Sequence, residues 1–190
     1  MNKFKTIIGI DPDKRGAIAI IQNKKIIDIV PLLAYRPNGL QTVQYHLKNM
    51  RKTLDRTLTP FNTKTTLIGL EETLNLPNRS SKGISTQNRI WQSIYQSISD
   101  LGFENIETVN PNAWISQMGL KQRSKIKINS NMSLTEKRLA QEHNRGLKTN
   151  IKKDRLNMLF LRHPYLKNSK VNALWADSGL IADYLMNNYF

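Results

Sequence analysis

The stretch IIGIDPDKRGAIAII, residues 7–21, decides the fold because it joins two apolar runs through a short charged turn. Runs rich in Ile and bounded by Gly, Asp and Pro are typical of buried strands and the turns that connect them. Asp11 stands at the end of the first run, where an ionised carboxylate costs free energy unless it is paired, hydrogen-bonded or bound to a metal ion. The rest of the chain should therefore supply a partner for this carboxylate.

Hydrophobic periodicity predicts an α/β fold. Short apolar runs indicate strands, at residues 4–11, 16–22, 25–30, 65–72 and 105–111. Apolar residues spaced three and four apart predict helices, at residues 39–55, 87–101, 111–118, 134–143, 152–162 and 171–188. This order describes a mixed sheet of about five strands flanked by helices, with a three-strand antiparallel meander at one side and parallel strands at the other. The runs 6–10 and 66–70 are expected at the centre of the sheet.

The length of 190 residues suits one domain with a substantial core and is too short for two large ones. We therefore expect a single domain over residues 1–190. Residues 120–153 are strongly basic and weakly apolar. They are predicted to form an excursion from the core that is mobile or touches nucleic acid.

Positive charge dominates the composition. The chain has 29 Lys and Arg residues against 14 Asp and Glu residues, a formal net charge of +15. A field of this sign concentrates polyanions, and nucleic acid is the commonest such partner of a basic protein. An AT-rich genome, whose codons favour Lys, Asn and Ile, is the alternative explanation of the composition.

Cysteine is absent, which excludes disulfides, thiol catalysis and thiolate metal sites and is compatible with a reducing compartment. No apolar run approaches the ~18 residues that cross a bilayer, so we expect no membrane partner. The first predicted strand begins almost at the first residue, which leaves no room for a signal or transit peptide.

Three acidic residues are predicted to converge at one edge of the sheet. Asp11 ends the first strand and Glu71 ends the strand 65–72, and adjacent parallel strands would bring both carboxylates to the same carboxyl edge. Asp177 lies in a C-terminal helix able to cross that edge. Three hard oxygen donors suit Mg²⁺ or Mn²⁺, and no His or Cys cluster favours zinc. A metal ion would then be the missing partner of Asp11.

Each of these acids also has an ordinary structural interpretation. Asp11 is followed by Pro12 and could form a turn, Glu71 could be a surface acid at a strand end, and Asp177 a solvated helix residue. Their joint placement at two strand ends and one helix favours the metal site.

The segments GIDPDKRGAIAI (9–20), IGLEE (68–72) and ADSGLIADY (176–184) resemble, in this order, the three acidic motifs of RuvC-type Holliday junction resolvases. That family has an RNase H-like fold. The GIDPD sequence after the first strand and the stretch VNPNAW (109–114) resemble the plastid-type (monokaryotic chloroplast) branch of the family.

The resemblance implies a homodimeric endonuclease that binds four-way DNA junctions and nicks two opposed strands. It also implies that Asp11, Glu71 and Asp177 are catalytic metal ligands. Two Mg²⁺ or Mn²⁺ ions are expected per active site, with Asp11 bridging both, Glu71 holding one and Asp177 holding the other. Trp91 and Tyr95 lie on the helix through which the family dimerises.

The family's fourth ligand is missing from its expected position. The family places a second acid or a His three or four residues before the last acid, where this chain has Leu174 and Ala173. Ala173 is either an inactivating substitution or a natural divergence. In the second case the site uses three acids or a more distant donor, for which the candidates are Asp183, His163 and Asp154.

DNA contacts are predicted from the loop 73–86, which follows Glu71 directly, from the cations after Asp11 and from the start of the helix 152–162. The candidates are Lys14, Arg15, Asn75, Asn78, Arg79, Ser80, Lys82, Lys152 and Lys153. For the last two, a solvated basic face is an equally open interpretation. The aromatic residues on the helices could stack on bases, but their spacing favours core packing. These are Trp91, Tyr95, Trp114 and Trp175.

Three rival functions remain open. An ATPase or sugar kinase of the actin type also opens with a strand, an Asp and a Gly-bearing hairpin, but 190 residues leave little room for its second domain. A junction-binding protein without catalysis is favoured by Ala173. Another RNase H-like nuclease, acting on RNA–DNA hybrids or transposon ends, would share the same acids.

Overall fold

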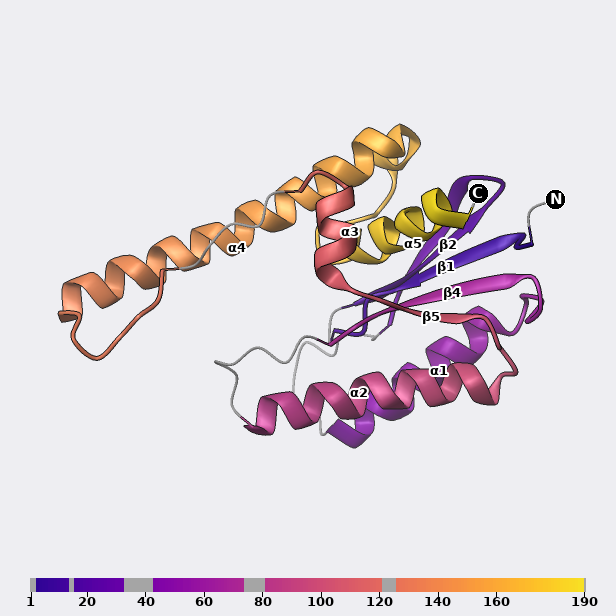
Figure 1. The fold of residues 1–190 in the computed structure, drawn as a ribbon, viewed down its shortest axis with the longest axis horizontal. Helices are drawn as coiled ribbons and strands as arrows, with labels where there is room; N and C mark the ends of the chain where they lie inside the picture. The colour runs from indigo at the N-terminus through magenta and orange to yellow at the C-terminus, as the bar shows by residue number, and fades with distance from the viewer. Residues whose placement is uncertain (1–2, 14–15, 33–42, 74–80, 121–125, 190) are drawn as a thin grey trace.

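A computed structural model describes residues 3–13, 16–32, 43–73, 81–120 and 126–189, and these form a mixed sheet flanked by helices (Figure 1). The sheet has five strands in the order β3-β2-β1-β4-β5. The strands are β1 Thr6–Ile10, β2 Ala17–Gln22, β3 Lys25–Pro31, β4 Thr66–Glu71 and β5 Ile106–Val109. The first three strands are antiparallel neighbours, whereas β4 runs parallel to β1 and β5 parallel to β4. The predicted meander and parallel side are confirmed.

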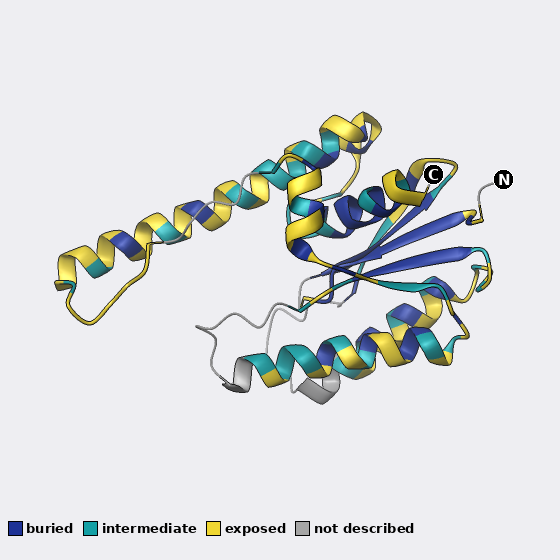
Figure 2. Ribbon diagram, in the orientation of Figure 1, coloured by how far each residue is buried: buried dark blue, intermediate teal, exposed yellow. Residues whose placement is uncertain are grey.

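Alternation along β1 explains why this strand is central. Ile7 belongs to the apolar cluster on one face of the sheet, and Ile8 and Ile10 belong to the cluster on the other face. Because successive side chains point to opposite faces, a strand covered on both faces needs apolar residues at every position. The five residues of β1 are all buried, as Figure 2 shows for both central strands.

The helices cover the two faces of the sheet in separate layers (Figure 1). Helices α1 Val43–Leu58 and α2 Ser81–Asp100 pack on one face, where Leu54 and Ile94 are fully buried. Helices α3 Pro111–Gln117 and α5 Ala176–Tyr189 pack on the other. Most of helix α5 is buried between Ala176 and Leu185, where all residues except Asp177 and Tyr184 are buried. A helix of this kind belongs in a core.

One long helix replaces the two helices predicted for residues 134–143 and 152–162. Helix α4, Leu134–Arg162, is continuous over 29 residues and projects from the body of the protein (Figure 1). It begins at a capping box in which Ser133 and Glu136 satisfy each other's backbone N–H groups. The prediction of a break was wrong because the middle turns are mostly polar, and their two buried residues, Ala140 and Leu147, are too few to give a clear apolar periodicity.

Two helix boundaries also differ from the prediction. Helix α2 begins at Ser81, inside the predicted loop 73–86, and α5 begins at Ala176 rather than near residue 171. Ahead of α5, the Asn172 side chain accepts a hydrogen bond from the Leu174 N–H at 2.8 Å. Such a side-chain bond offers the backbone an alternative to the helix and delays its start. A short 3₁₀ helix, η1 Pro164–Asn168, links α4 to this turn.

None of the helices in the ranges given above is long and apolar enough to span a membrane.

Candidate active site

The carboxyl ends of the two central parallel strands place Asp11 beside Glu71. Ile10 of β1 pairs with Leu70 of β4, so Asp11 and Glu71 are the next residues along the two strands. Side-chain alternation puts both carboxyl groups on the face of the sheet that α5 covers, the face to which Gly9 also belongs.

Gly9 allows α5 to lie directly against β1 next to this edge. A Cβ atom at residue 9 would stand 2.4 Å from the backbone O of Ser178 and 2.4 Å from the backbone N of Ala182. Only glycine permits an approach this close. The contact fixes the first turn of α5, and therefore Asp177, beside the ends of β1 and β4.

Asp11, Glu71 and Asp177 form one group of interacting charges, named the carboxylate cluster below. Burial raises the pKa of Asp11 well above its usual value, and the charges of Glu71 and Asp177 raise this pKa further. Burial and the charge of Asp177 raise the pKa of Glu71 to about 7. Like charges act this way only at short range, so residues far apart in the sequence share one site.

Two tryptophans hold Glu71 in place. The indole Nε1–H of Trp114 donates to Glu71 Oε1 at 2.9 Å, and the Nε1–H of Trp91 donates to the Glu71 backbone carbonyl, also at 2.9 Å. Trp114 is fully buried on α3, which confirms the core packing predicted for it. A buried indole N–H needs an acceptor, and here that acceptor is a carboxylate of the cluster.

Arg155 of α4 pairs with Asp177. Its guanidinium donates to Asp177 Oδ2 and lies over the Trp114 ring, 5.2 Å from the ring centroid. Burial raises the pKa of Asp177, and the charge and hydrogen bond of Arg155 partly offset this rise. The other oxygen, Oδ1, is buried and has no hydrogen-bond partner within the described part of the chain. One oxygen of Asp177 is therefore satisfied and one is not.

The more distant donors considered from the sequence belong elsewhere. Asp183 is buried and paired with Arg162 of α4, and His163 Nε2 lies 3.5 Å from Asp183 Oδ1. Burial raises the pKa of Asp183, but the bonds from His163 and Arg162 outweigh it and hold this pKa below the usual value. Asp183 thus links α5 to α4, and Arg162 compensates its charge.

The position of the missing fourth ligand is not in a helix. Residues 173–175 form a turn ahead of α5, and Ala173 is partly buried there. The expectation that α5 already includes residues 173 and 174 was therefore wrong. Asn172, the nearest polar residue, is engaged with the backbone of this turn.

The cluster has the chemistry of a site for a hard divalent cation. Its three carboxyl groups repel one another, and Asp177 Oδ1 lacks a partner among the described residues, which is the situation that Mg²⁺ or Mn²⁺ relieves. As they stand, no three His, Cys, Asp or Glu side chains in the described ranges are grouped closely enough to hold an ion. Arg155 occupies part of the space, since it holds Asp177 Oδ2.

Most of the predicted DNA-contacting residues lie outside the described residues. These are Lys14, Arg15, Asn75, Asn78, Arg79 and Ser80. Lys82 falls in the first turn of α2 rather than in a loop, and its side chain is also outside the described part. Lys152 is exposed on α4, and its charge lowers the pKa of Asp177, so it lies near the cluster. Lys153 is exposed as well, and no interaction described here connects it with the cluster.

Sequence reasoning missed three residues at this site. Arg155 carries the cation beside Asp177, and Trp114 carries the donor to Glu71. Asp13 contributes a charge that raises the pKa of Asp11 and Glu71, and its backbone N–H donates to Asp11 Oδ1 at 3.0 Å. Asp13 stands in the motif quoted first, two residues after Asp11, where a second acid beside the first could have indicated its role.

Comparison with known proteins identifies the fold. No protein-family model and no curated protein matches the chain. Among solved structures, "T. thermophilus RuvC in complex with Holliday junction substrate" is 12% identical with a TM-score of 0.58, covering 93% of this chain and 89% of that chain. The "Thermus thermophilus RuvC structure" is 11% identical with a TM-score of 0.56, covering 97% of both chains. The likeness to the plastid-type branch stays a prediction. The chain has the mixed five-strand α/β fold of RuvC, which is RNase H-like.

Proposed function

We propose that this protein is an endonuclease that binds four-way DNA junctions and nicks two opposed strands with the help of Mg²⁺ or Mn²⁺. The observation that carries the proposal is the carboxylate cluster at the carboxyl edge of β1 and β4, on a fold that RuvC shares. The carboxyl edge of parallel strands is where α/β proteins place their ligands. A RuvC structure holds a Holliday junction substrate, which supports the same substrate class for this chain.

Each residue of the cluster has a role in the proposed reaction. A bound divalent ion would polarise the scissile phosphate and lower the pKa of the attacking water. Asp11 and Glu71 would hold the ion, with Trp114 fixing the orientation of Glu71 through its N–H. Asp177 would offer Oδ1, the oxygen without a partner among the described residues. Lys152 would contact the phosphate, a role supported by its exposure and by its charge acting on Asp177.

A basic face of α4 offers a path for the DNA duplex that leaves the site. Residues three, four or seven apart share one side of a helix. Arg138, Arg145, Lys148, Lys152 and Arg155 follow this spacing, and all but Arg155 are exposed. This basic face of α4 extends from the cluster over roughly 25 Å of helix. Regularly spaced cations of this kind suit the phosphates of a duplex.

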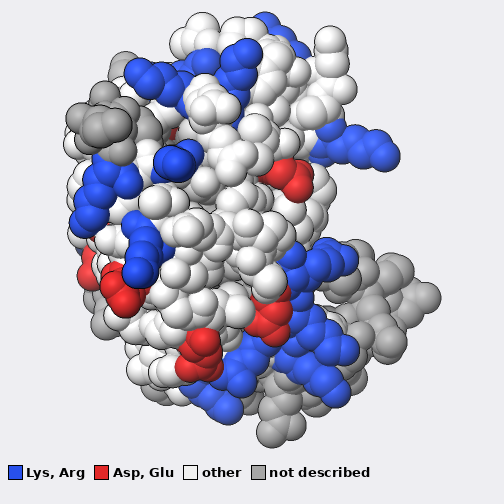
Figure 3. Space-filling model, turned by 90° about the vertical axis from the view of Figure 1, so that its right-hand side faces the viewer, with Lys and Arg blue, Asp and Glu red and all other residues white. Residues whose placement is uncertain are grey.

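Charge alone does not locate the DNA, because Lys and Arg are spread widely. Figure 3 shows the end of the molecule that bears the two chain termini, with basic side chains over much of it and acidic ones between them. The general field attracts a polyanion to the whole surface. The basic face of α4 is distinguished by its continuity with the carboxylate cluster.

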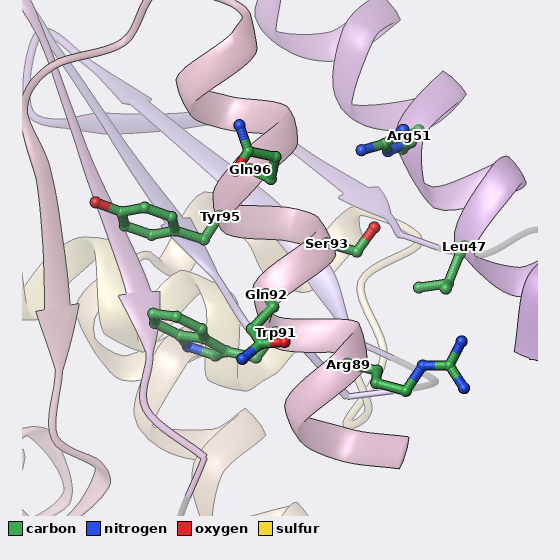
Figure 4. Close-up of a pocket in the computed structure, with 8 residues that line it drawn as sticks. All are labelled: Leu47, Arg51, Arg89, Trp91, Gln92, Ser93, Tyr95 and Gln96. Atoms are coloured by element: carbon green, nitrogen blue, oxygen red, sulfur yellow. The ribbon is translucent and has the colours of Figure 1, made fainter. Parts of the chain in front are cut away.

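A second copy of the chain is proposed to dock on the outer side of α1 and α2. A hollow of about 500 Å³ there is lined by residues that include Leu47, Arg51, Arg89, Trp91 and Tyr95. Figure 4 shows Leu47, Arg51 and Arg89 on one side of α2 and the aromatic side chains of Trp91 and Tyr95 on the other. Trp91 and Tyr95 stack with ring centroids 5.4 Å apart, and Tyr95 remains 41% exposed, so the core packing predicted for Tyr95 was wrong. Stacked, uncovered aromatics are frequent anchors of protein interfaces. A dimer would present two cutting sites to two opposed strands.

The test is a nicking assay on a four-way junction whose strands are labelled one at a time. The protein binds the junction in Ca²⁺, and Mg²⁺ is then added. Paired nicks on opposed strands are expected, with no cutting by Asp11→Asn, whose junction affinity should stay within a few fold of wild type. Linear duplex and RNA–DNA hybrid serve as competitors. Equal cutting or equal binding of these competitors would overturn the choice of substrate.

A non-catalytic junction-binding protein is the second candidate. It is favoured by Ala173 at the missing ligand position and by the pairing of Arg155 with Asp177, which compensates one acid without a metal. The same assay separates the two functions. Tight, junction-selective binding in Ca²⁺ without nicks in Mg²⁺ or Mn²⁺ would establish binding alone.

A further inference from the structure

The outer part of α4 and the chain segment ahead of it form an arm that stands clear of the body (Figure 1). Residues 126–148 are named the α4 arm below. Asn144 fastens the segment to the helix, since its side chain accepts from the Ile126 N–H and donates to the Ile126 carbonyl, both at 3.0 Å. The Lys137 ammonium donates to the Ser130 carbonyl at 3.2 Å. The segment therefore lies along the helix and belongs to the arm.

The α4 arm has a covered side and a basic side. Ala140 and Leu147 are its buried residues, and their spacing puts them on the same side of the helix as Asn144, which holds the segment. Arg138 and Arg145 each precede one of these buried residues by two positions, about 160° around the helix, and both are exposed. The segment thus covers the apolar side and leaves the basic side open.

The basic face of α4 connects the α4 arm to the carboxylate cluster. One end of this face is Arg155, which pairs with Asp177, and the other end is Arg138. These two arginines are 17 positions apart, about 25 Å along the helix, which is the length of about 7 base pairs of duplex. Arg138 lies 3.4 Å from Glu142, but both side chains are largely exposed. Such a pair contributes little and yields readily to a phosphate.

From this geometry, and on the basis of the proposed nuclease function, we propose that the α4 arm binds along one duplex arm of the junction, over about 7 base pairs from the branch point. The cations stand in line on a stiff helix, so they suit a polyanion that is also straight and stiff. Duplex DNA, with a persistence length of about 150 base pairs, is straight over this distance. A single strand or an unfolded acidic peptide would have to give up its conformational freedom to match it.

The experiment removes phosphate charge from chosen stretches of a four-way junction without shortening its arms. Methylphosphonate linkages are neutral and keep the duplex paired. A neutral block at about base pairs 5 to 8 from the branch point would face Arg145 and Arg138, whereas a block at about base pairs 11 to 14 lies beyond the α4 arm. Each block is placed in one pair of opposed arms at a time. Fluorescence anisotropy in Ca²⁺ measures binding.

The expected result is a loss of affinity that depends on the position of the block. In one pair of opposed arms, the inner block should weaken binding by wild type at least about tenfold, because each lost phosphate contact costs most of a decade in affinity at moderate salt. The outer block should leave the affinity unchanged. Two opposed arms respond together because a dimer presents one α4 arm to each.

A double variant ties this loss of affinity to the α4 arm. Arg138→Gln with Arg145→Gln should bind the unmodified junction as weakly as wild type binds the junction with the inner block, and that block should cause no further loss. Both replaced side chains are exposed, and Gln favours helices, so α4 is expected to persist. Lys5→Gln with Lys64→Gln, also at exposed positions, is the matched control and should keep the full effect of the inner block.

Several outcomes would overturn the inference. The inner block could have no effect in either pair of arms, or the same effect on wild type and on the Arg138 and Arg145 double variant. An outer block that weakens binding as much as the inner one would contradict the length of the contact. Equal binding of a junction whose contacted arms are single-stranded would contradict the duplex. Unchanged junction affinity of the double variant would assign the α4 arm to another partner.

Failure of the inference and failure of the proposed function give different results. A protein that binds junctions selectively and nicks them, but does not respond to the inner block, keeps the proposed function and loses the role of the α4 arm. A protein that responds to the inner block but leaves every strand uncut in Mg²⁺ and Mn²⁺ keeps the role of the α4 arm and loses the nuclease.

Discussion

Glu71 is the residue of the site on which hydrogen bonds, burial and neighbouring charges all act. It receives N–H groups from Trp114 and Trp91, and the charge of Asp177 acts on it across a buried space. The hydrogen bond from Trp114 and the charge of Arg155 favour the ionised form of the Glu71 side chain, whereas burial and the charge of Asp177 oppose it and have the larger effect. The surroundings of the Glu71 side chain therefore destabilise its ionised form, unless a cation binds beside it.

A pH dependence of stability follows from the raised pKa of Glu71. The pKa rises from 4.5 to about 7 on folding, so between these values the folded protein binds more protons than the unfolded chain. The free energy of unfolding should therefore fall as the pH rises from about 5 to 8 in EDTA, on the order of 2 kcal/mol. Chemical denaturation at both pH values measures this.

Two controls accompany the pH experiment. Glu71→Gln carries no titrating group, so most of the loss of stability between pH 5 and 8 should vanish. Saturating Mg²⁺ should restore stability at pH 8 in wild type and less so in Glu71→Gln, because binding to the folded state alone stabilises it. A free energy of unfolding of the wild-type protein that stays constant or rises between pH 5 and 8 would contradict the raised pKa of Glu71.

Ala173→Asp is the second prediction at the scale of single residues. A carboxylate in the turn ahead of α5 would add a ligand beside Asp177 and should raise Mg²⁺-dependent junction cutting about tenfold, which corresponds to about 1.4 kcal/mol in the barrier. Ala173→His should have the same direction. An unchanged rate in both variants would remove this position from the site, and Ala173→Ser is the control for polarity without a ligand.

At the scale of elements, the contact between α5 and β1 depends on the absence of a side chain at Gly9. Gly9→Ala would place a carbon 2.4 Å from two backbone atoms of α5. The helix would have to move away, and we expect the free energy of unfolding to drop by about 3 kcal/mol. Mn²⁺ binding should weaken with it, because Asp177 moves too.

Gly146 provides the matched control for this substitution. It lies inside α4, and a Cβ atom there would meet nothing within 4 Å. Gly146→Ala should therefore raise the free energy of unfolding by about 0.5 to 1 kcal/mol through helix propensity alone. Thermal or urea denaturation of the two variants side by side decides the point. Equal effects would mean that the close approach at Gly9 does not hold α5.

The aromatic pair on α2 makes a prediction about assembly. Tyr95→Glu puts a charge into the proposed interface, and the monomer–dimer dissociation constant should rise at least about 30-fold, since interface anchors carry about 2 kcal/mol or more. Light scattering coupled to gel filtration measures it. Ile27 of β3 is also an exposed apolar residue, 53% accessible, and Ile27→Glu should leave the dimer intact. Dimers that survive Tyr95→Glu would place the interface elsewhere.

The elements of the sheet were predictable because each strand carries its own signal. All five strands were expected close to their observed positions, and the runs 6–10 and 66–70 are the adjacent parallel strands β1 and β4. Local apolar runs and turn residues suffice for such strands. Helix α4 was not predictable as one helix, because charged and polar residues dominate its middle and the buried face there is narrow, with Ala140 and Leu147 as its buried residues.

The acids of the site could be named from the sequence, but their environment could not. Asp11 and Glu71 are marked by their places at strand ends, which the topology then brings to one edge. Arg155 lies 22 residues before Asp177 on an element whose path over the sheet the sequence does not specify. Its pairing depends on tertiary packing, for which no local pattern exists. The sequence identified Trp114 only as an aromatic residue for core packing or base stacking. It did not predict that the Trp114 N–H would donate to Glu71.

At the scale of the whole molecule, the basic face of α4 predicts how binding responds to salt. The double variant Arg145→Gln with Lys148→Gln should weaken junction binding and reduce the slope of log K against log salt by about two. Lys5 and Lys64 are exposed at the opposite edge of the sheet, and their replacement by Gln is the control that should leave the slope unchanged. Fluorescence anisotropy at several salt concentrations measures both.

The unbroken course of α4 has a mechanical consequence. Every turn of an α-helix is tied to the next by hydrogen bonds, so the element behaves as a stiff rod over its length. Leu159, fully buried against α5, anchors the rod near one end, while the opposite end stands clear of the body. Arg155 sits one turn from that anchor. A force that a bound duplex exerts on the outer turns of α4 would therefore be transmitted along the helix to the Arg155 guanidinium beside Asp177.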